Sequence, residues 1–251
     1  MKPQLRSGDV VFAVFAIAYL VLCTSKEWMN ELPKTVTVTL KALPIWILLG
    51  SLLYYSEING LEDDTDSGGV NKKRHYKLTC FGLLFGSIGD VLLALDKSDD
   101  KDDEGGVFFL CGLVSFLLAH IFYAVGLYNK QRPFRWPVLA LFAVFACSYF
   151  AVLFKNLDNI MLAPVAMYTI TIAAMAVLAD GSNNMWARVG AVSFVASDSC
   201  LAWNMFASEF WQASFVIMAT YYTAQFLLMR SAVYQNKQAS GDYSEPILCA
   251  N

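Results

Sequence analysis

Apolar residues in this chain gather into long runs that polar segments separate. A helix needs about 20 predominantly apolar residues to cross the hydrocarbon core of a bilayer. Windows of that length predict eight transmembrane helices, with longer polar connections only at 57–76 and 96–106. The expected spans are 8–25, 36–56, 77–95, 107–127, 136–154, 160–179, 188–206 and 211–231. The pattern therefore predicts an all-α membrane protein built as an eight-helix transmembrane bundle.

The lysines and arginines give this bundle an orientation. Positively charged residues concentrate in the cytoplasmic loops of membrane proteins. With the N-terminus in the cytoplasm, twelve of the 18 lysines and arginines fall in inner segments, five fall in outer segments, and Lys41 lies within a span. We therefore expect both termini to be cytoplasmic. Residues 1–234 would form a single transmembrane domain, and 235–251 a short polar cytoplasmic tail.

Short sequence matches suggest an internal repeat with an offset of four helices. Asp90-x-x-Leu-Ala94 in the third span matches Asp198-x-x-Leu-Ala202 in the seventh, and prolines occur in the second and sixth spans. Such an offset relates two parallel halves by an axis along the membrane normal. This 4+4 parallel pseudo-repeat is a hypothesis, and it would place the two aspartates at comparable depth, facing each other.

Composition narrows the range of functions. The chain is 57% hydrophobic and 16% charged, which is typical of a multi-pass membrane protein. It has no basic stripe and no nucleic-acid motif, so nucleic acid is excluded as a partner. Gly-x-Ser-x-Gly, His-Glu-x-x-His and a glycine-rich phosphate loop are also missing. With two histidines, one of them in a span, a histidine-rich metal centre is excluded, and we expect neither a metal nor a cofactor.

Four ionisable residues remain inside the predicted spans: Lys41, Asp90, His120 and Asp198. A charge in hydrocarbon costs roughly 2.5–3.5 kcal/mol on insertion scales, so such residues usually mark a functional site. Two carboxylates close together in a low dielectric cannot both ionise readily, so one keeps its proton while the other stays charged. Such a pair can act as general acid and base in an enzyme, or move protons in a transporter. A purely structural ion pair through Lys41 is the third explanation.

At these residues the sequence resembles the lysoplasmalogenase family, also called YhhN. The resemblance extends from the second to the eighth span. It is carried by Lys41-x-x-Pro44, Leu84-Phe-Gly-Ser-Ile-Gly-Asp90, Phe109-x-x-Gly112-Leu, Ala119-His-x-Phe-Tyr123, Tyr168, Ser197-Asp198-x-x-x-Ala202-x-Asn204 and Tyr221-Tyr-x-Ala-Gln225.

This resemblance implies hydrolysis of the vinyl ether bond of lysoplasmalogens, giving a fatty aldehyde and glycerophosphoethanolamine or glycerophosphocholine. It implies that Asp90 and Asp198 are the catalytic pair, in the membrane of the endoplasmic reticulum. The expected partners are a lysophospholipid substrate and membrane lipids. The alternative is a proton-coupled transporter or lipid-moving protein that uses the same buried acids. The residues expected to bind substrate or support the pair are Lys41, His120, Tyr123, Tyr168, Asn204, Tyr221 and Gln225.

Overall fold

The computed structural model describes residues 4–58, 69–95, 106–129 and 135–239, and the regular elements in these ranges are all helical. Each predicted span coincides with one long helix. Residues 59–68 and 96–105 of the two longer connections, and 240–251 of the predicted tail, lie outside the described residues. The helices are α1 (Gln4–Cys23), α2 (Lys26–Glu31), α3 (Lys34–Ile58), α4 (Gly69–Leu95), α5 (Val107–Leu127), α6 (Trp136–Leu153), α7 (Asn159–Gly181), α8 (Met185–Phe206) and α9 (Ala213–Ala239), with a 3₁₀ turn η1 (Phe154–Asn156).

Several helix boundaries differ from the prediction. Helix α4 begins at Gly69 rather than at residue 77, and α9 continues to Ala239 rather than to 231. The hydropathy pattern marks only the apolar part of a helix, whereas intrahelical hydrogen bonds can continue into polar residues beyond it. The short helix α2 was not predicted, and the Ser25 side chain caps its N-terminus by accepting a hydrogen bond from the Trp28 backbone N–H.

Five helices of the described residues are long and apolar enough to cross a membrane. These segments are Lys34–Ile58, Lys73–Leu95, Val107–Leu127, Trp136–Asn156 and Asn159–Gly181. The apolar part of α1, Ser7–Cys23, is shorter. Helix α8 is not among the five and carries Arg188 and Asp198. The protein is therefore an all-helical, multi-pass membrane protein.

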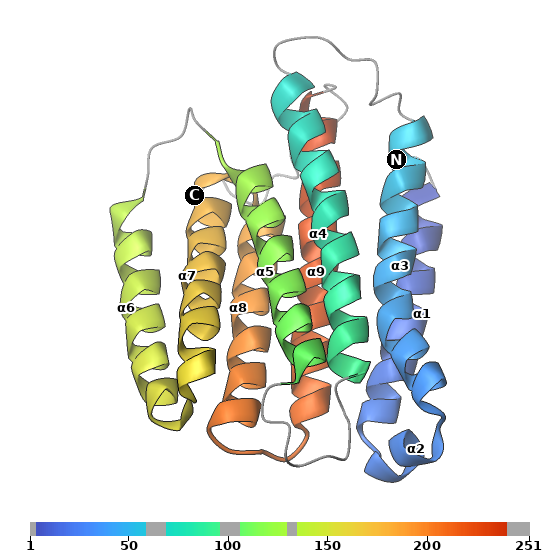
Figure 1. Ribbon diagram of the computed structural model, residues 1–251. Helices are drawn as coiled ribbons and strands as arrows, with labels where there is room; N and C mark the ends of the chain where they lie inside the picture. The colour runs from blue at the N-terminus through green and yellow to red at the C-terminus, as the bar shows by residue number, and fades with distance from the viewer. Residues whose placement is uncertain (1–3, 59–68, 96–105, 130–134, 240–251) are drawn as a thin grey trace, which may run out of the picture.

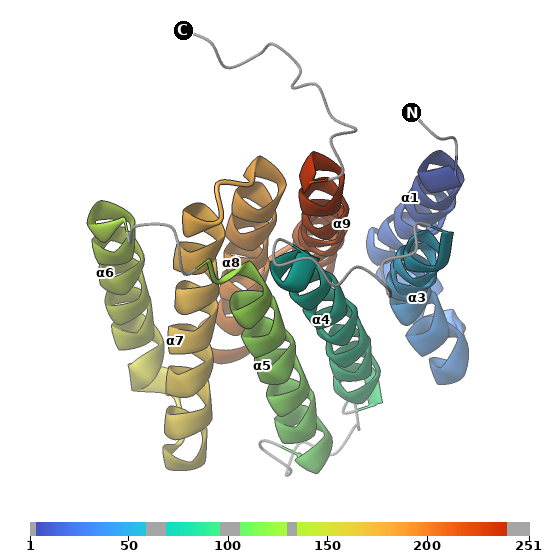
Figure 2. The same cartoon turned by 90° about the horizontal axis from the view of Figure 1, so that it is seen from above.

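The helices pack in two layers (Figure 2). Helices α7, α5, α4 and α3 form one layer, and α8, α9 and α1 form the other. Helix α6 stands outside both, against α7, and Leu153 is the buried residue among those that the structure describes in it. Helix α1 begins and α9 ends at the same end of the bundle (Figure 1). Helix α6 therefore borders the bundle, with most of its side chains exposed.

Two prolines lie inside helices, Pro44 in α3 and Pro164 in α7. Proline has no backbone N–H and its ring crowds the preceding turn, so nearby carbonyl groups need other donors. In α3 the hydroxyl of Tyr222 on α9 donates a hydrogen bond to the Lys41 carbonyl oxygen at 2.8 Å. This bond connects α3 to α9 one turn before Pro44. The side chain of Lys41 forms an ion pair with Asp90.

Candidate functional site

Asp198 on α8 is held by two aromatic side chains from other helices. The Tyr168 hydroxyl on α7 donates to Asp198 Oδ2 at 2.6 Å. His120 Nε2 on α5 lies 3.0 Å from the same oxygen and 2.9 Å from the Tyr168 hydroxyl. His120 is fully buried, and the Asp198 side chain is 12% exposed. Three helices thus converge on one carboxylate oxygen.

The geometry assigns the tautomer of His120. The single hydroxyl proton of Tyr168 is directed at Asp198, so the tyrosine oxygen can only accept from the histidine. Nε2 must therefore carry a proton, which both Asp198 Oδ2 and the Tyr168 oxygen accept. Nδ1 of His120 is buried without a hydrogen-bond partner among the described residues. Because a buried N–H there would stay unsatisfied, we assign the neutral Nε2–H form.

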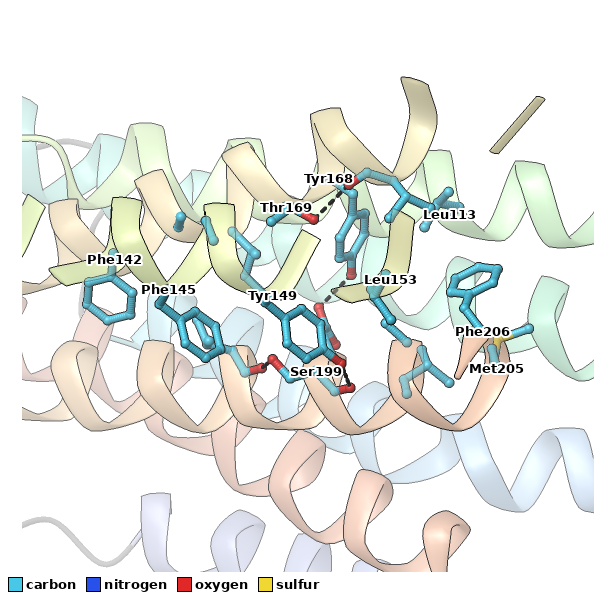
Figure 3. A pocket seen from close by; sticks show the side chains of 18 of the residues that line it. Leu113, Phe142, Phe145, Tyr149, Leu153, Tyr168, Thr169, Ser199, Met205 and Phe206 are labelled. Carbon is cyan, nitrogen blue, oxygen red and sulfur yellow. Dashed lines mark hydrogen bonds between the residues drawn. The ribbon is translucent and has the colours of Figure 1, made fainter. Parts of the chain in front are cut away.

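The other oxygen of Asp198 faces an apolar groove. Oδ1 has no hydrogen-bond partner among the described residues, and it is not one of their buried unpaired atoms. It is therefore accessible, and Asp198 lines the groove. The space is about 780 Å³, part of it open to the outside, and α4 to α8 all contribute to its walls. Figure 3 shows Tyr149 and Tyr168 near the middle of the groove, Phe142 and Phe145 at one end, and Met205 and Phe206 at the other. The groove thus combines hydrocarbon walls with one free carboxylate oxygen, as a site for an amphiphile requires.

Asp90 on α4 has a different environment. Lys41 Nζ from α3 lies 3.2 Å from Asp90 Oδ1, and the Tyr221 hydroxyl from α9 donates to Oδ2 at 2.7 Å. The Asp90 side chain is 3% exposed and the Lys41 side chain 16%. Asp90 does not line the groove that contains Asp198. Gly89, next to Asp90, packs so closely on the Phe116 ring that a β-carbon there would lie 2.6 Å from it.

The two carboxylates lie in neighbouring clusters rather than against each other. No hydrogen bond joins Asp90 and Asp198 in the described part of the chain, although they are within electrostatic range. The Phe194 ring bridges the clusters, with its centroid 4.5 Å from that of His120 and 5.5 Å from that of Tyr221. The sequence had predicted two aspartates that face each other at comparable depth. The structure shows one carboxylate in a groove and the other in a buried ion pair.

Three of the expected site residues remain to be placed: Tyr123 and Gln225, which lie near Asp90, and Asn204, which belongs to neither cluster. The Tyr123 hydroxyl donates to Gln225 Oε1 at 2.5 Å, one turn of α9 beyond Tyr221. Gln225 is fully buried beside Gly86, which lies one turn before Asp90 on α4. Tyr123 and Gln225 therefore belong to the Asp90 side of the site. Asn204 lies elsewhere. Its side-chain oxygen accepts a hydrogen bond from the Phe210 backbone N–H at 3.3 Å, in the connection between α8 and α9.

Two polar residues were missed by the sequence analysis. The Tyr149 hydroxyl on α6 donates to the Ser199 carbonyl oxygen on α8, across the groove and directly after Asp198. A lone tyrosine in an apolar run gives no sequence signal for such a role. His75 was placed before the third span, but α4 begins earlier, and His75 is buried with Nε2 3.1 Å from the Ser231 hydroxyl.

Comparisons with known proteins agree with the resemblance described above. The chain is 31% identical over 197 residues to the human lysoplasmalogenase TMEM86B, covering 77% of this chain and 74% of the relative. It is 27% identical to lysoplasmalogenase TMEM86B of Rattus norvegicus, covering 92% and 86% of the two chains. It is 29% identical to lysoplasmalogenase TMEM86A of Bos taurus, covering 64% and 67%. No solved structure matches. The YhhN family model matches residues 36–232, and the chain belongs to the YhhN family.

Proposed function

We propose that this protein is a lysoplasmalogenase, a hydrolase that cleaves the vinyl ether bond of lysoplasmalogens within the membrane. The observation that carries the proposal is the free Asp198 Oδ1 inside an apolar groove. The names of the relatives support the same reaction. The products are a fatty aldehyde and glycerophosphoethanolamine or glycerophosphocholine.

The bond itself determines which catalyst is needed. A vinyl ether has no carbonyl group, so a serine or cysteine nucleophile has nothing to attack. Its hydrolysis begins with transfer of a proton to the β-carbon, which leaves an oxocarbenium ion at the carbon bound to oxygen. Water adds to that carbon and loses a proton, and the hemiacetal then separates into aldehyde and alcohol. The site must therefore supply a positioned acid that later accepts a proton, as paired carboxylates do at other oxocarbenium centres.

Asp198 has the geometry of this acid. Oδ2 accepts hydrogen bonds from Tyr168 and His120, so a proton carried by Asp198 sits on Oδ1, the oxygen that faces the groove. After that proton moves to the β-carbon, the carboxylate stabilises the cation and takes a proton from the attacking water. Tyr168 and His120 hold the carboxyl group in place for both steps.

Asp90 is proposed to support Asp198 through its charge. Its carboxylate accepts a hydrogen bond from Tyr221, whose ring contacts the Phe194 ring, and it lies within electrostatic range of Asp198. A buried anion at that position favours a developing cation in the groove. Lys41 and Tyr221 fix the position of the Asp90 carboxylate.

The proposal also includes the membrane arrangement expected from the sequence. In it, α1, α8 and α9 cross the bilayer together with the five apolar segments. Their polar residues are accommodated because polar groups within membrane proteins face the bundle interior. Both termini lie in the cytoplasm, and the membrane is that of the endoplasmic reticulum.

The reaction is tested with purified full-length protein in detergent and lysoplasmenylethanolamine as substrate. Release of fatty aldehyde together with glycerophosphoethanolamine is the expected result. A saturated ether lysolipid of equal chain length is the control, because it has no double bond to protonate. Absence of aldehyde from every lysoplasmalogen would exclude the proposed function. Lipid flux across sealed proteoliposomes without product would indicate a transporter instead.

Replacing Tyr168 with phenylalanine removes one of the two donors to Asp198 Oδ2. We expect kcat to fall about tenfold and KM to stay unchanged, because a hydrogen bond of this kind contributes on the order of 1.5 kcal/mol. Tyr76→Phe is the matched control, since it removes a buried tyrosine hydrogen bond to the Leu52 carbonyl oxygen outside the groove. Equal loss of kcat in both variants would contradict a positioning role for Tyr168.

A further inference from the structure

The groove extends to both sides of Asp198. Toward the C-terminus of α8 its wall continues to Phe206, eight positions later, which corresponds to about 12 Å along the helix. Toward the N-terminus of α8 the lining from that helix ends at Val195, one turn away, and the groove continues between α6 and α7 to Phe142. We call the part toward Phe206 the closed arm and define it by Leu93, Leu113, Ala202, Met205, Phe109 and Phe206.

More helices line the closed arm than line the rest of the groove. Helices α4 and α5 contribute their lining residues, Leu93, Phe109 and Leu113, at this end. The part around Phe142 is lined only by residues of α6, α7 and α8, at the edge of the bundle where α6 stands (Figures 1 and 3). An amphiphile that enters beside α6 therefore meets Asp198 before it reaches the closed arm.

Two phenylalanines close this arm. The rings of Phe109 on α5 and Phe206 on α8 meet edge to face, with centroids 6.2 Å apart. Phe109 is 5% exposed and belongs to a second hydrophobic cluster with Leu153, Met161 and Val165. Phe206 packs against this cluster, and its member Met161 does not line the groove. The Phe109–Phe206 pair therefore forms a packed wall at the end of the arm.

We infer that the closed arm binds the alkenyl chain of the substrate and that the Phe109–Phe206 pair limits the chain length that it accepts. This inference rests on the proposed function for the identity of the chain. The lining of the arm beyond Ser199 is apolar, so a phosphate or an ethanolamine group placed there would lose its hydration without compensation. A hydrocarbon chain gains free energy from the same surface in proportion to the area it buries. With the chain in the arm, its first carbons lie beside Asp198 Oδ1, where the proton is needed.

The test measures binding, so that it does not depend on turnover. The probes are saturated 1-O-alkyl lysophosphoethanolamines with chains from octyl to octadecyl, titrated into the full-length protein. For the wild type, affinity should rise about fourfold per added methylene until the chain reaches the wall, and then level off. Phe206→Ala lengthens the arm and should move the plateau to longer chains. Ala202→Leu fills the arm one turn nearer to Asp198 and should move the plateau to shorter chains.

Two further variants keep the test decisive. Phe108→Ala removes an exposed ring next to Phe109 that does not line the groove, and its plateau should match the wild type. Phe206→Leu makes the same change as Phe206→Ala with less loss of packing, and serves if the alanine variant does not fold. An identical plateau in every variant would overturn the inference. Shifted plateaus in a protein that releases no aldehyde would support the closed arm and exclude the proposed reaction.

Discussion

Asp198→Asn is expected to reduce kcat for aldehyde release by about 10³-fold, within the range of positioned general acids. Asparagine has nearly the same shape, and its amide oxygen can still accept the hydrogen bonds from Tyr168 and His120. Its NH₂ group then replaces Oδ1 at the groove and cannot deliver a proton as a carboxylic acid does. The folded structure should be kept while the chemistry is lost.

The measurement is steady-state aldehyde release, with binding of a saturated ether lysolipid as the check on folding. Binding should change little, because the chain contacts apolar walls that the substitution leaves intact. Asp158→Asn is the matched control, since Asp158 is exposed at the start of α7 and its side chain does not cap that helix. Wild-type turnover in the Asp198 variant would remove Asp198 as the acid.

Breaking the Lys41–Asp90 pair is expected to have the largest effect on stability. Lys41→Met leaves the Asp90 carboxylate buried beside Tyr221 without its cation. Removing one partner of a buried ion pair typically costs about 3–5 kcal/mol, because the remaining charge is uncompensated. The measurement is the unfolding midpoint of the purified protein, which should fall clearly below that of the wild type.

The double variant Lys41→Met/Asp90→Leu separates structure from chemistry. Replacing both charges with apolar side chains of similar size is often neutral for stability, so the unfolding midpoint should recover. Turnover should not recover, because the anion that favours the cationic intermediate is missing. Full activity in the stable double variant would show that Asp90 serves only the fold.

Hydropathy located every long helix because the bilayer requires apolar segments of a set length. It could not show where α4 begins, because Gly69 and the polar residues after it are helical without being apolar. It also could not show α2, which is too short to give an apolar period and depends on the Ser25 cap. Helix ends are local hydrogen-bonding events, and hydropathy does not report them.

The site was predictable as a set of residues but not as an arrangement. Ionisable groups in apolar spans are conspicuous, so Lys41, Asp90, His120 and Asp198 could be named from the sequence. Which of them pair depends on how α3, α5 and α9 pack around α4 and α8. Asn204 shows the limit, because its motif position suggested the site and its side chain instead bonds the Phe210 backbone.

The position of α6 makes the groove dependent on its surroundings. This helix has 18 residues, about 27 Å in length, against a hydrocarbon core of roughly 30 Å. Among the described residues of α6, only Leu153 is buried, and the Tyr149 hydroxyl reaches α8 across the groove. A span shorter than the hydrocarbon core is accommodated by local thinning of the bilayer, at a cost that rises with the mismatch. Because α6 residues form one wall of the groove, the thickness of the host membrane would then bear on the shape of the groove.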